Sequence, residues 1–168
     1  MSSDIPFLSA TQLNEAYKSR QLSPVEVVKV TLERIEKLQP SVNAFVTVCA
    51  DDALLAAKHA EANLRSDGAA PLTGVPFSVK DLLPTKGLRT TYGSPVFSEN
   101  IPVHDAIAVQ RLKQAGAILV GKTTTPAIGH KAITTSLVSG ISRNPWNLKH
   151  SCGGSSGGAA AAVASGQG

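Results

Sequence analysis

Two stretches of the chain carry side chains that could do chemistry. The first is "SCGGSSGGAAAAVASG", which begins at Ser151 and in which a glycine-rich turn with Ser155 and Ser156 leads directly into an alanine-rich helix. The start of a helix presents unpaired backbone amides and the positive end of the helix dipole, and both stabilise anions. Hydroxyls placed there predict either an anion-binding turn or part of a serine-based acyl-transfer site.

The second stretch is "GVPFSVKD", in which Lys80 ends a strand-like segment and Asp81 follows it. One interpretation is a solvated lysine–aspartate pair at the surface, which contributes little. The other is a lysine held at the edge of an apolar sheet, where desolvation favours the neutral amine. A neutral amine can act as a general base near neutral pH. The residues alone leave both interpretations open.

The segment "GAILVGKT" (116–123) fits the pattern of a nucleotide-binding P-loop letter for letter. In a P-loop, however, these residues form a loop that follows a strand and precedes a helix. Here a predicted helix comes first, and the four central residues are apolar, as in a buried strand. Pro126 is also a poor start for the helix that should follow. The context therefore argues against nucleotide binding.

The histidines and cysteines form no recognisable catalytic or metal-binding pattern. The four histidines have no spacing typical of metal ligands, so no metal site and no cofactor are predicted. His150 lies close enough to Ser155 in sequence for a serine–histidine pair, but the sequence supplies no geometry for one. Cys152 could be the nucleophile of a nitrilase-type site, but no suitable glutamate accompanies it. Cys49 and Cys152 are expected to be free thiols.

The elements that must position these residues alternate between helices and strands. Ser23 and Glu26 form a capping box before an apolar helical repeat that Pro40 is expected to end. Asp51 or Asp52 is expected to open a later helix that closes at Gly68. The predicted helices are 11–20, 23–39, 51–68, 105–116 and from 157 onward, and the predicted strands are 43–48, 74–80 and 117–122. This alternation favours an α/β fold with a largely parallel sheet covered by helices.

The bulk composition is that of one ordinary domain. The chain has 168 residues, of which 42% are hydrophobic and 4% aromatic, with a net charge of +4. Basic residues are scattered and not interleaved with aromatics, which argues against a nucleic-acid partner. The N-terminus lacks the features of a signal peptide, and no apolar run is long enough to span a membrane. A cytoplasmic protein without a membrane partner is expected.

Five blocks, taken in order, carry a resemblance that covers most of the chain from about residue 72 onward. The blocks are "GVPFSVKD", "TYGSPVF", "DAIAVQRLKQAGAILVGKT", "SRNPWN" and "GGSSGGAAAAVASG". Together they strongly resemble the amidase signature family, whose members hydrolyse or transfer carboxamides through a Ser–Ser–Lys triad. The resemblance implies a mixed β-sheet flanked by helices, with residues 1–168 forming the N-terminal portion of a single amidase signature domain. It also implies small-molecule amide substrates and is compatible with a homo-oligomer.

The resemblance implies specific roles. Lys80 matches the family's base, and Ser155 matches the bridging serine, which in the family follows a cis peptide bond and relays the proton between lysine and nucleophile. The flanking glycines accommodate that backbone. Ser156 is expected to support the loop by hydrogen bonds. The glycines that match the family's loop are Gly153, Gly154, Gly157 and Gly158.

The family's nucleophilic serine comes roughly two dozen residues after the bridging serine, near position 179, in a turn that forms the oxyanion hole. The chain is therefore expected to be the front third of a longer amidase and inactive alone, with uncovered faces on "AILV" and "VPFSV". The stretch "TTTPAIGHKAITTS" favours a free-standing amidase. The alternatives are the glutamine amidase subunit of a tRNA-dependent amidotransferase and a non-catalytic interaction module.

Overall fold

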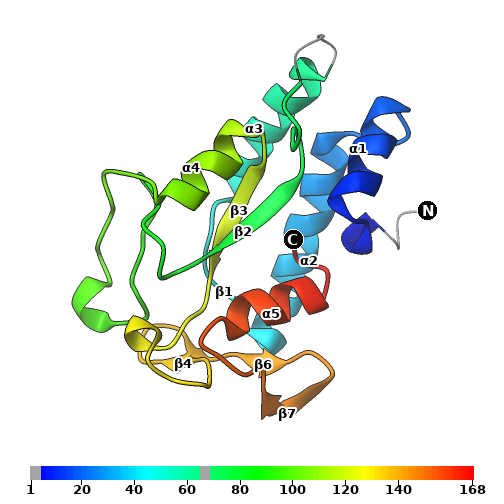
Figure 1. Ribbon diagram of the computed structural model, residues 1–168. Helices are drawn as coiled ribbons and strands as arrows, with labels where there is room; N and C mark the ends of the chain where they lie inside the picture. The colour runs from blue at the N-terminus through cyan, green and yellow to red at the C-terminus, as the bar shows by residue number, and fades with distance from the viewer. Residues whose placement is uncertain (1–4, 65–68) are drawn as a thin grey trace.

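The computed structural model describes residues 5–64 and 69–168, and in it helices pack around a small mixed sheet (Figure 1). This confirms the predicted α/β class. The helices are α1 (Ala10–Lys18), α2 (Pro24–Val42), α3 (Ala50–Asn63), α4 (Ile107–Gln114) and α5 (Gly157–Ala164), with short 3-10 turns η1 (Ile5–Phe7), η2 (Pro95–Phe97) and η3 (Ala127–Gly129). The strands are β1 (Phe45–Val48), β2 (Pro76–Lys80), β3 (Ile118–Thr123), β4 (Thr135–Ser136), β5 (Gly140–Ile141), β6 (Arg143–Asn144) and β7 (Asn147–Ser151).

The main sheet has the order β1-β3-β2, with β3 in the centre. Strand β2 runs parallel to β3, as the intervening α4 crossover predicts, whereas β1 is antiparallel to β3. The expectation of a largely parallel sheet is wrong in this respect, because the apolar pattern of a buried strand does not encode its direction. The pairing of β2 with β3 is irregular: Phe77 lies opposite Leu119, but Ser78 lies opposite Gly121. Beyond this bulge Lys80 lies opposite Thr123.

Helix α2 is the longest helix and begins with the predicted capping box of Ser23 and Glu26. It does not end at Pro40 but continues to Val42, because a proline removes only its own N–H donor and later residues can still bond to earlier carbonyls, as the Asn43 N–H does to Gln39. Asn43 ends the helix in a left-handed conformation, with φ of 52°. The side-chain Nδ2 of Asn43 also donates to the carbonyls of Ser139 and Ile141, which links the helix end to the β4–β5 hairpin.

Helices α3 and α4 start without the side-chain caps expected of them. Helix α3 begins at Ala50 after Cys49, which forms no capping bond, and Asp51 and Asp52 lie within the first turn, where the helix dipole favours acidic side chains. The expected end at Gly68 falls outside the described residues. Helix α4 begins only at Ile107, since the carboxylate of Asp105 instead accepts from the Lys86 amide and the Lys113 ammonium. Local patterning placed these helices within a few residues.

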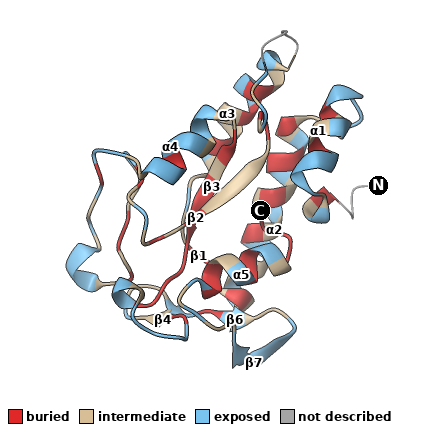
Figure 2. Ribbon diagram, viewed as in Figure 1, coloured by how far each residue is buried: buried red, intermediate tan, exposed pale blue. Residues whose placement is uncertain are grey.

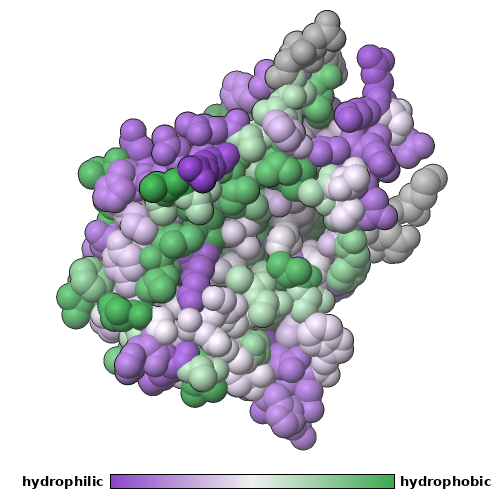
Figure 3. Space-filling model, in the orientation of Figure 1, coloured by the Kyte–Doolittle hydropathy of each residue, from purple (hydrophilic) through white to green (hydrophobic). Residues whose placement is uncertain are grey.

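The core lies between α2, α3, α5 and the centre of the sheet (Figure 2). One face of "AILV" is covered, because Ile118 and Val120 on β3 are 2% and 0% exposed, beneath α3 and α5, whereas Leu119 between them is half-buried. In β2, by contrast, only Val79 is buried, and β2 forms an edge of the sheet. Figure 3 shows apolar side chains on the face that carries β2 and α5. The segment from η2 to the start of α4 also has strongly exposed apolar residues: Val96, Ile101, Val103 and Ile107.

Candidate active site

The structure brings the two chemically suggestive stretches together. Lys80 is the last residue of β2, and its ammonium donates to Ser155 Oγ at 2.7 Å and to Ser156 Oγ at 3.0 Å. Burial lowers the pKa of Lys80 below its ordinary value of 10.5. A lysine whose pKa is lowered by burial and whose amine contacts a hydroxyl has the geometry of a base beside a proton donor.

The turn that carries the serines is shaped by its glycines. The Gly154–Ser155 peptide is cis, and Gly153 has φ of 77°, a conformation that side chains disfavour. A Cβ at Gly154 would lie within 3.0 Å of the backbone of Ala132 and Ile133, so the chains can approach this closely only at a glycine. The predicted glycines therefore do lie where the backbone requires them.

Two threonines that the sequence patterns did not single out hold this turn. Thr134 Oγ1 donates to the Gly153 carbonyl at 2.8 Å and accepts from the Gly157 amide at 3.0 Å. Thr125 Oγ1 donates to the Ser155 carbonyl at 3.3 Å. Thr134 is about twenty residues from the serines in sequence, so no local pattern could have revealed the contact. The run "TTT" at 123–125 was the only sequence signal for Thr125.

The remaining candidates have different surroundings. Ser156, expected to support the loop, contacts Lys80 directly and makes no side-chain capping bond to α5. His150 lies on β7, all of whose residues are exposed, and the structure gives no hydrogen bond between it and Ser155. Burial raises the pKa of the Cys152 thiol, whose sulfur contacts the Ser142 carbonyl, so this thiol is a poor nucleophile.

The P-loop-like segment is a strand, as its apolar residues predicted. Lys122, the motif's lysine, is fully buried on β3 and donates to the Leu83 carbonyl, to Thr85 Oγ1 at 2.8 Å and to Thr90 Oγ1 at 3.0 Å. All three protons of its ammonium are therefore used within the protein. A lysine so engaged is not available for a phosphate group, which agrees with the interpretation drawn from the sequence.

We expect stability to rise between pH 8 and 9 because of Lys122. Burial lowers its pKa from 10.5 to about 8, while Asp81, Asp105 and Cys49 raise it and Lys113 lowers it further. Above pH 8 the unfolded chain holds a proton that the folded chain has lost, which stabilises the folded state by up to about 1.4 kcal/mol per pH unit.

Other groups oppose this rise at higher pH. Burial raises the pKa of Cys49 from 9.0 to about 11, so above pH 9 its unfolded thiol ionises first and stability falls; Cys152 acts in the same direction. Burial also raises the pKa of Tyr17, which opposes the rise above pH 10. Urea unfolding in reducing buffer at pH 7, 8 and 9 measures the rise, and Lys122→Met should diminish it. An equal rise in that variant would contradict the assignment.

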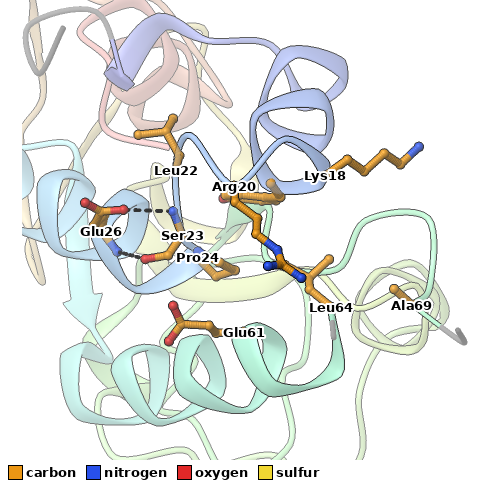
Figure 4. Close-up of a pocket in the computed structure, with 10 residues that line it drawn as sticks. Lys18, Arg20, Leu22, Ser23, Pro24, Glu26, Glu61, Leu64 and Ala69 are labelled. Atoms are coloured by element: carbon orange, nitrogen blue, oxygen red, sulfur yellow. Dashed lines mark hydrogen bonds between the residues drawn. The ribbon is translucent and has the colours of Figure 1, made fainter. Parts of the chain in front are cut away.

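A cavity of about 650 Å³ lies elsewhere, between α1, the start of α2 and the end of α3 (Figure 4). The capping bonds between Ser23 and Glu26 lie at its wall, and the side chains of Arg20 and Glu61 also line it. Neither Lys80 nor Ser155 belongs to this lining. The lysine–serine arrangement is therefore separate from the cavity.

The described residues give two further observations. Over 5–64 and 69–168, the His, Cys, Asp and Glu side chains form no group of three that could hold a metal ion. Within the same ranges, no helix combines the length and apolar character needed to cross a bilayer.

The mixed sheet and the glycine-rich serine turn above a strand-end lysine place the chain in the amidase class of α/β proteins. The chain belongs to the Amidase family, whose sequence profile matches residues 26–168. Among curated relatives, it is 42% identical over 157 residues to the A subunit of glutamyl-tRNA(Gln) amidotransferase from Geobacter metallireducens. That alignment covers 94% of this chain and 32% of that protein.

Solved structures show the same relationship. A bacterial aryl acylamidase of the amidase signature family matches with a TM-score of 0.91 at 34% identity, covering 96% of this chain and 34% of that one. The peptide amidase of Stenotrophomonas maltophilia matches with a TM-score of 0.87 at 29% identity, covering 94% and 34%. The chain thus spans about a third of the length of the relatives that it matches.

Proposed function

We propose that residues 1–168 are the N-terminal portion of a single amidase domain and supply the base and the proton relay of an amide-hydrolysing site. The observation that carries the proposal is the 2.7 Å contact between Lys80 Nζ and Ser155 Oγ. Lys80 is the base and Ser155 the relay. The proposal assigns no nucleophile within residues 1–168, because the resemblance implies that the nucleophilic serine follows Ser155 by roughly two dozen residues, and we expect no turnover by these residues alone.

In the proposed reaction, neutral Lys80 accepts the proton of the Ser155 hydroxyl as Ser155 accepts the proton of the nucleophile. The nucleophilic oxygen then forms a bond to the carboxamide carbon. The same relay returns the proton to the departing nitrogen as the C–N bond breaks. Water releases the acyl group, so the products are a carboxylic acid and ammonia or an amine.

The proposed substrate is a small carboxamide hydrolysed by a free-standing enzyme. The structural neighbours named for aryl acylamide and peptide amide hydrolysis support this choice. A second candidate, release of ammonia from glutamine for a partner protein, is favoured by the 42% identity to one component of an amidotransferase. Glutamine hydrolysis that depends on tRNA and on a partner protein would identify the second function.

The test is a graft in which residues 1–168 replace the matching third of the bacterial aryl acylamidase, assayed with a chromogenic aryl acylamide. In this graft we expect Ser155→Ala to lower kcat/KM by at least about a thousandfold, because the proton relay is lost. Ser156→Ala, which removes a hydroxyl of the same kind, is the matched control and should cost less than about tenfold.

Thermal unfolding of each graft establishes that it is folded. A Ser155→Ala graft with nearly full activity would contradict the proposed role of this serine as the proton relay. If the purified 168-residue chain hydrolysed the amide and Lys80→Ala abolished that activity, the nucleophile would have to lie within residues 1–168.

A further inference from the structure

Lys122 is a buried lysine that the proposed reaction does not use. Its residue is 0% exposed, and among the described residues no carboxylate lies within ion-pair distance of its ammonium. Burying a charge is costly unless its hydrogen bonds are satisfied. Here they are satisfied by Leu83, Thr85 and Thr90.

All three acceptors belong to the segment 81–93, which follows Lys80 directly. The segment starts with the Asp81 amide donating to the Thr123 carbonyl at 2.9 Å. It closes on itself because the buried Asp81 carboxylate accepts from the amide and the hydroxyl of Thr91. The amide of Gly93 then donates to Thr91 Oγ1 at 3.1 Å. The segment 81–93 therefore forms a loop with the Lys122 ammonium inside it.

The outer side of this loop contacts the segment 125–129, which lies beside the serine turn. A Cβ at Gly129 would lie 3.0 Å from Leu82 Cδ2 and 3.9 Å from Ser155 Oγ, so Gly129 has Leu82 and the Ser155 hydroxyl as neighbours. The Tyr92 carbonyl accepts from the Ile128 amide at 2.7 Å. The loop thus adjoins Lys80 at its start and the surroundings of Ser155 along its length.

We propose that Lys122 is a positioning residue: its ammonium organises the loop 81–93, and the loop holds Lys80 against Ser155. Lys122 acts from the central strand, one residue before Thr123, which is paired with Lys80. The inference rests on the proposed role of Lys80 as the base. The chemistry of the loop explains why its inward-facing residues Thr85 and Thr90 carry hydroxyls although they are fully buried.

The test follows the pKa of Lys80 in the 168-residue chain by NMR of isotope-labelled lysine side chains, with Lys80→Arg to assign the signal. The variant is Thr85→Val with Thr90→Val, which removes two acceptors but keeps the Lys122 side chain. Because burial lowers the pKa of Lys80, a loosened loop should admit water and raise that pKa toward its ordinary value. The control is Thr47→Val, which removes a buried hydroxyl without a hydrogen-bond partner.

An unchanged Lys80 pKa in the double variant, with a lower unfolding temperature, would overturn the proposal, because the threonines would then serve stability alone. If the double variant does not fold, Thr90→Val decides in the same way, and Thr90→Ser should restore the original pKa. This readout needs no turnover. Its failure is therefore distinguishable from failure of the proposed amidase activity, which the graft measures.

Discussion

Replacing Lys80 by methionine in the grafted amidase is expected to lower kcat/KM by about ten-thousandfold to a millionfold, as loss of one member of a cooperating catalytic set does. Methionine keeps the length of the stem but has no amine to accept the Ser155 proton. The 2.7 Å contact between Lys80 Nζ and Ser155 Oγ disappears with it. A colorimetric assay of aryl acylamide hydrolysis measures the loss.

Two further variants separate base chemistry from charge and from general effects of lysine removal. Lys80→Arg retains a cation with several donors but cannot release a proton near neutral pH, so its loss should match that of Lys80→Met. Lys149→Met makes the same substitution at an exposed position of β7 and should leave the rate unchanged. If Lys80→Arg kept a tenth of the activity, Lys80 would be acting as a fixed charge.

Replacing Gly157 by alanine is expected to destabilise the chain by about 2–3 kcal/mol, the cost typical of an overpacked site. The new Cβ would overlap Thr134 Oγ1 and lie 2.7 Å from Cys152 Sγ. Thr134 cannot turn away without losing both its bond to the Gly153 carbonyl and its bond from the Gly157 amide. Helix propensity alone predicts the opposite, a gain of up to about 1 kcal/mol for alanine in a helix. We expect the steric cost to be larger.

Urea unfolding of the chain and its variants measures this difference. Gly153→Ala is the matched control, since no atom lies within 4 Å of its new Cβ and only the backbone cost at a φ of 77° remains. That cost is about 1–2 kcal/mol. In Thr134→Ser, which keeps the hydroxyl but removes a methyl group, Gly157→Ala should remain costly. A Gly157→Ala chain more stable than the original would contradict the steric argument.

The sequence predicted the elements better than their ends and their partners. The capping box of Ser23 and Glu26 is a local pattern, and the structure contains it where predicted. Pro40 was a misleading signal because a proline removes only its own N–H donor, and the residues after it can still bond to earlier carbonyls. Asp105 resembled a helix cap, but its oxygens are engaged by Lys86 and Lys113. A competing partner from another segment cannot be read from local spacing.

The candidate site was also only partly predictable, because local spacing reveals some of its residues but not their distant contacts. Lys80 and Ser155 stood out because of their immediate neighbours and a family resemblance, and the fold brings them within hydrogen-bond distance. Thr134 did not, and Lys122 stood out only as part of the P-loop-like segment, because each acts through contacts with residues about twenty or more positions away. The burial of Ile118 and Val120 on β3 was also not predictable from spacing, since it depends on how α3 and α5 pack on that face of the strand.

The bulge between β2 and β3 lets the chain before Phe77 tolerate changes in length. Because the pairing shifts by one residue after Phe77, the facing of Lys80 is set by the four residues from Ser78 to Asp81 and their partners on β3. An insertion or deletion before Phe77 can be absorbed at the bulge without turning Lys80 to the other face of the sheet. The length of the chain upstream can therefore vary, while inserting or deleting one residue within Ser78–Asp81 would turn the Lys80 side chain to the other face of the sheet.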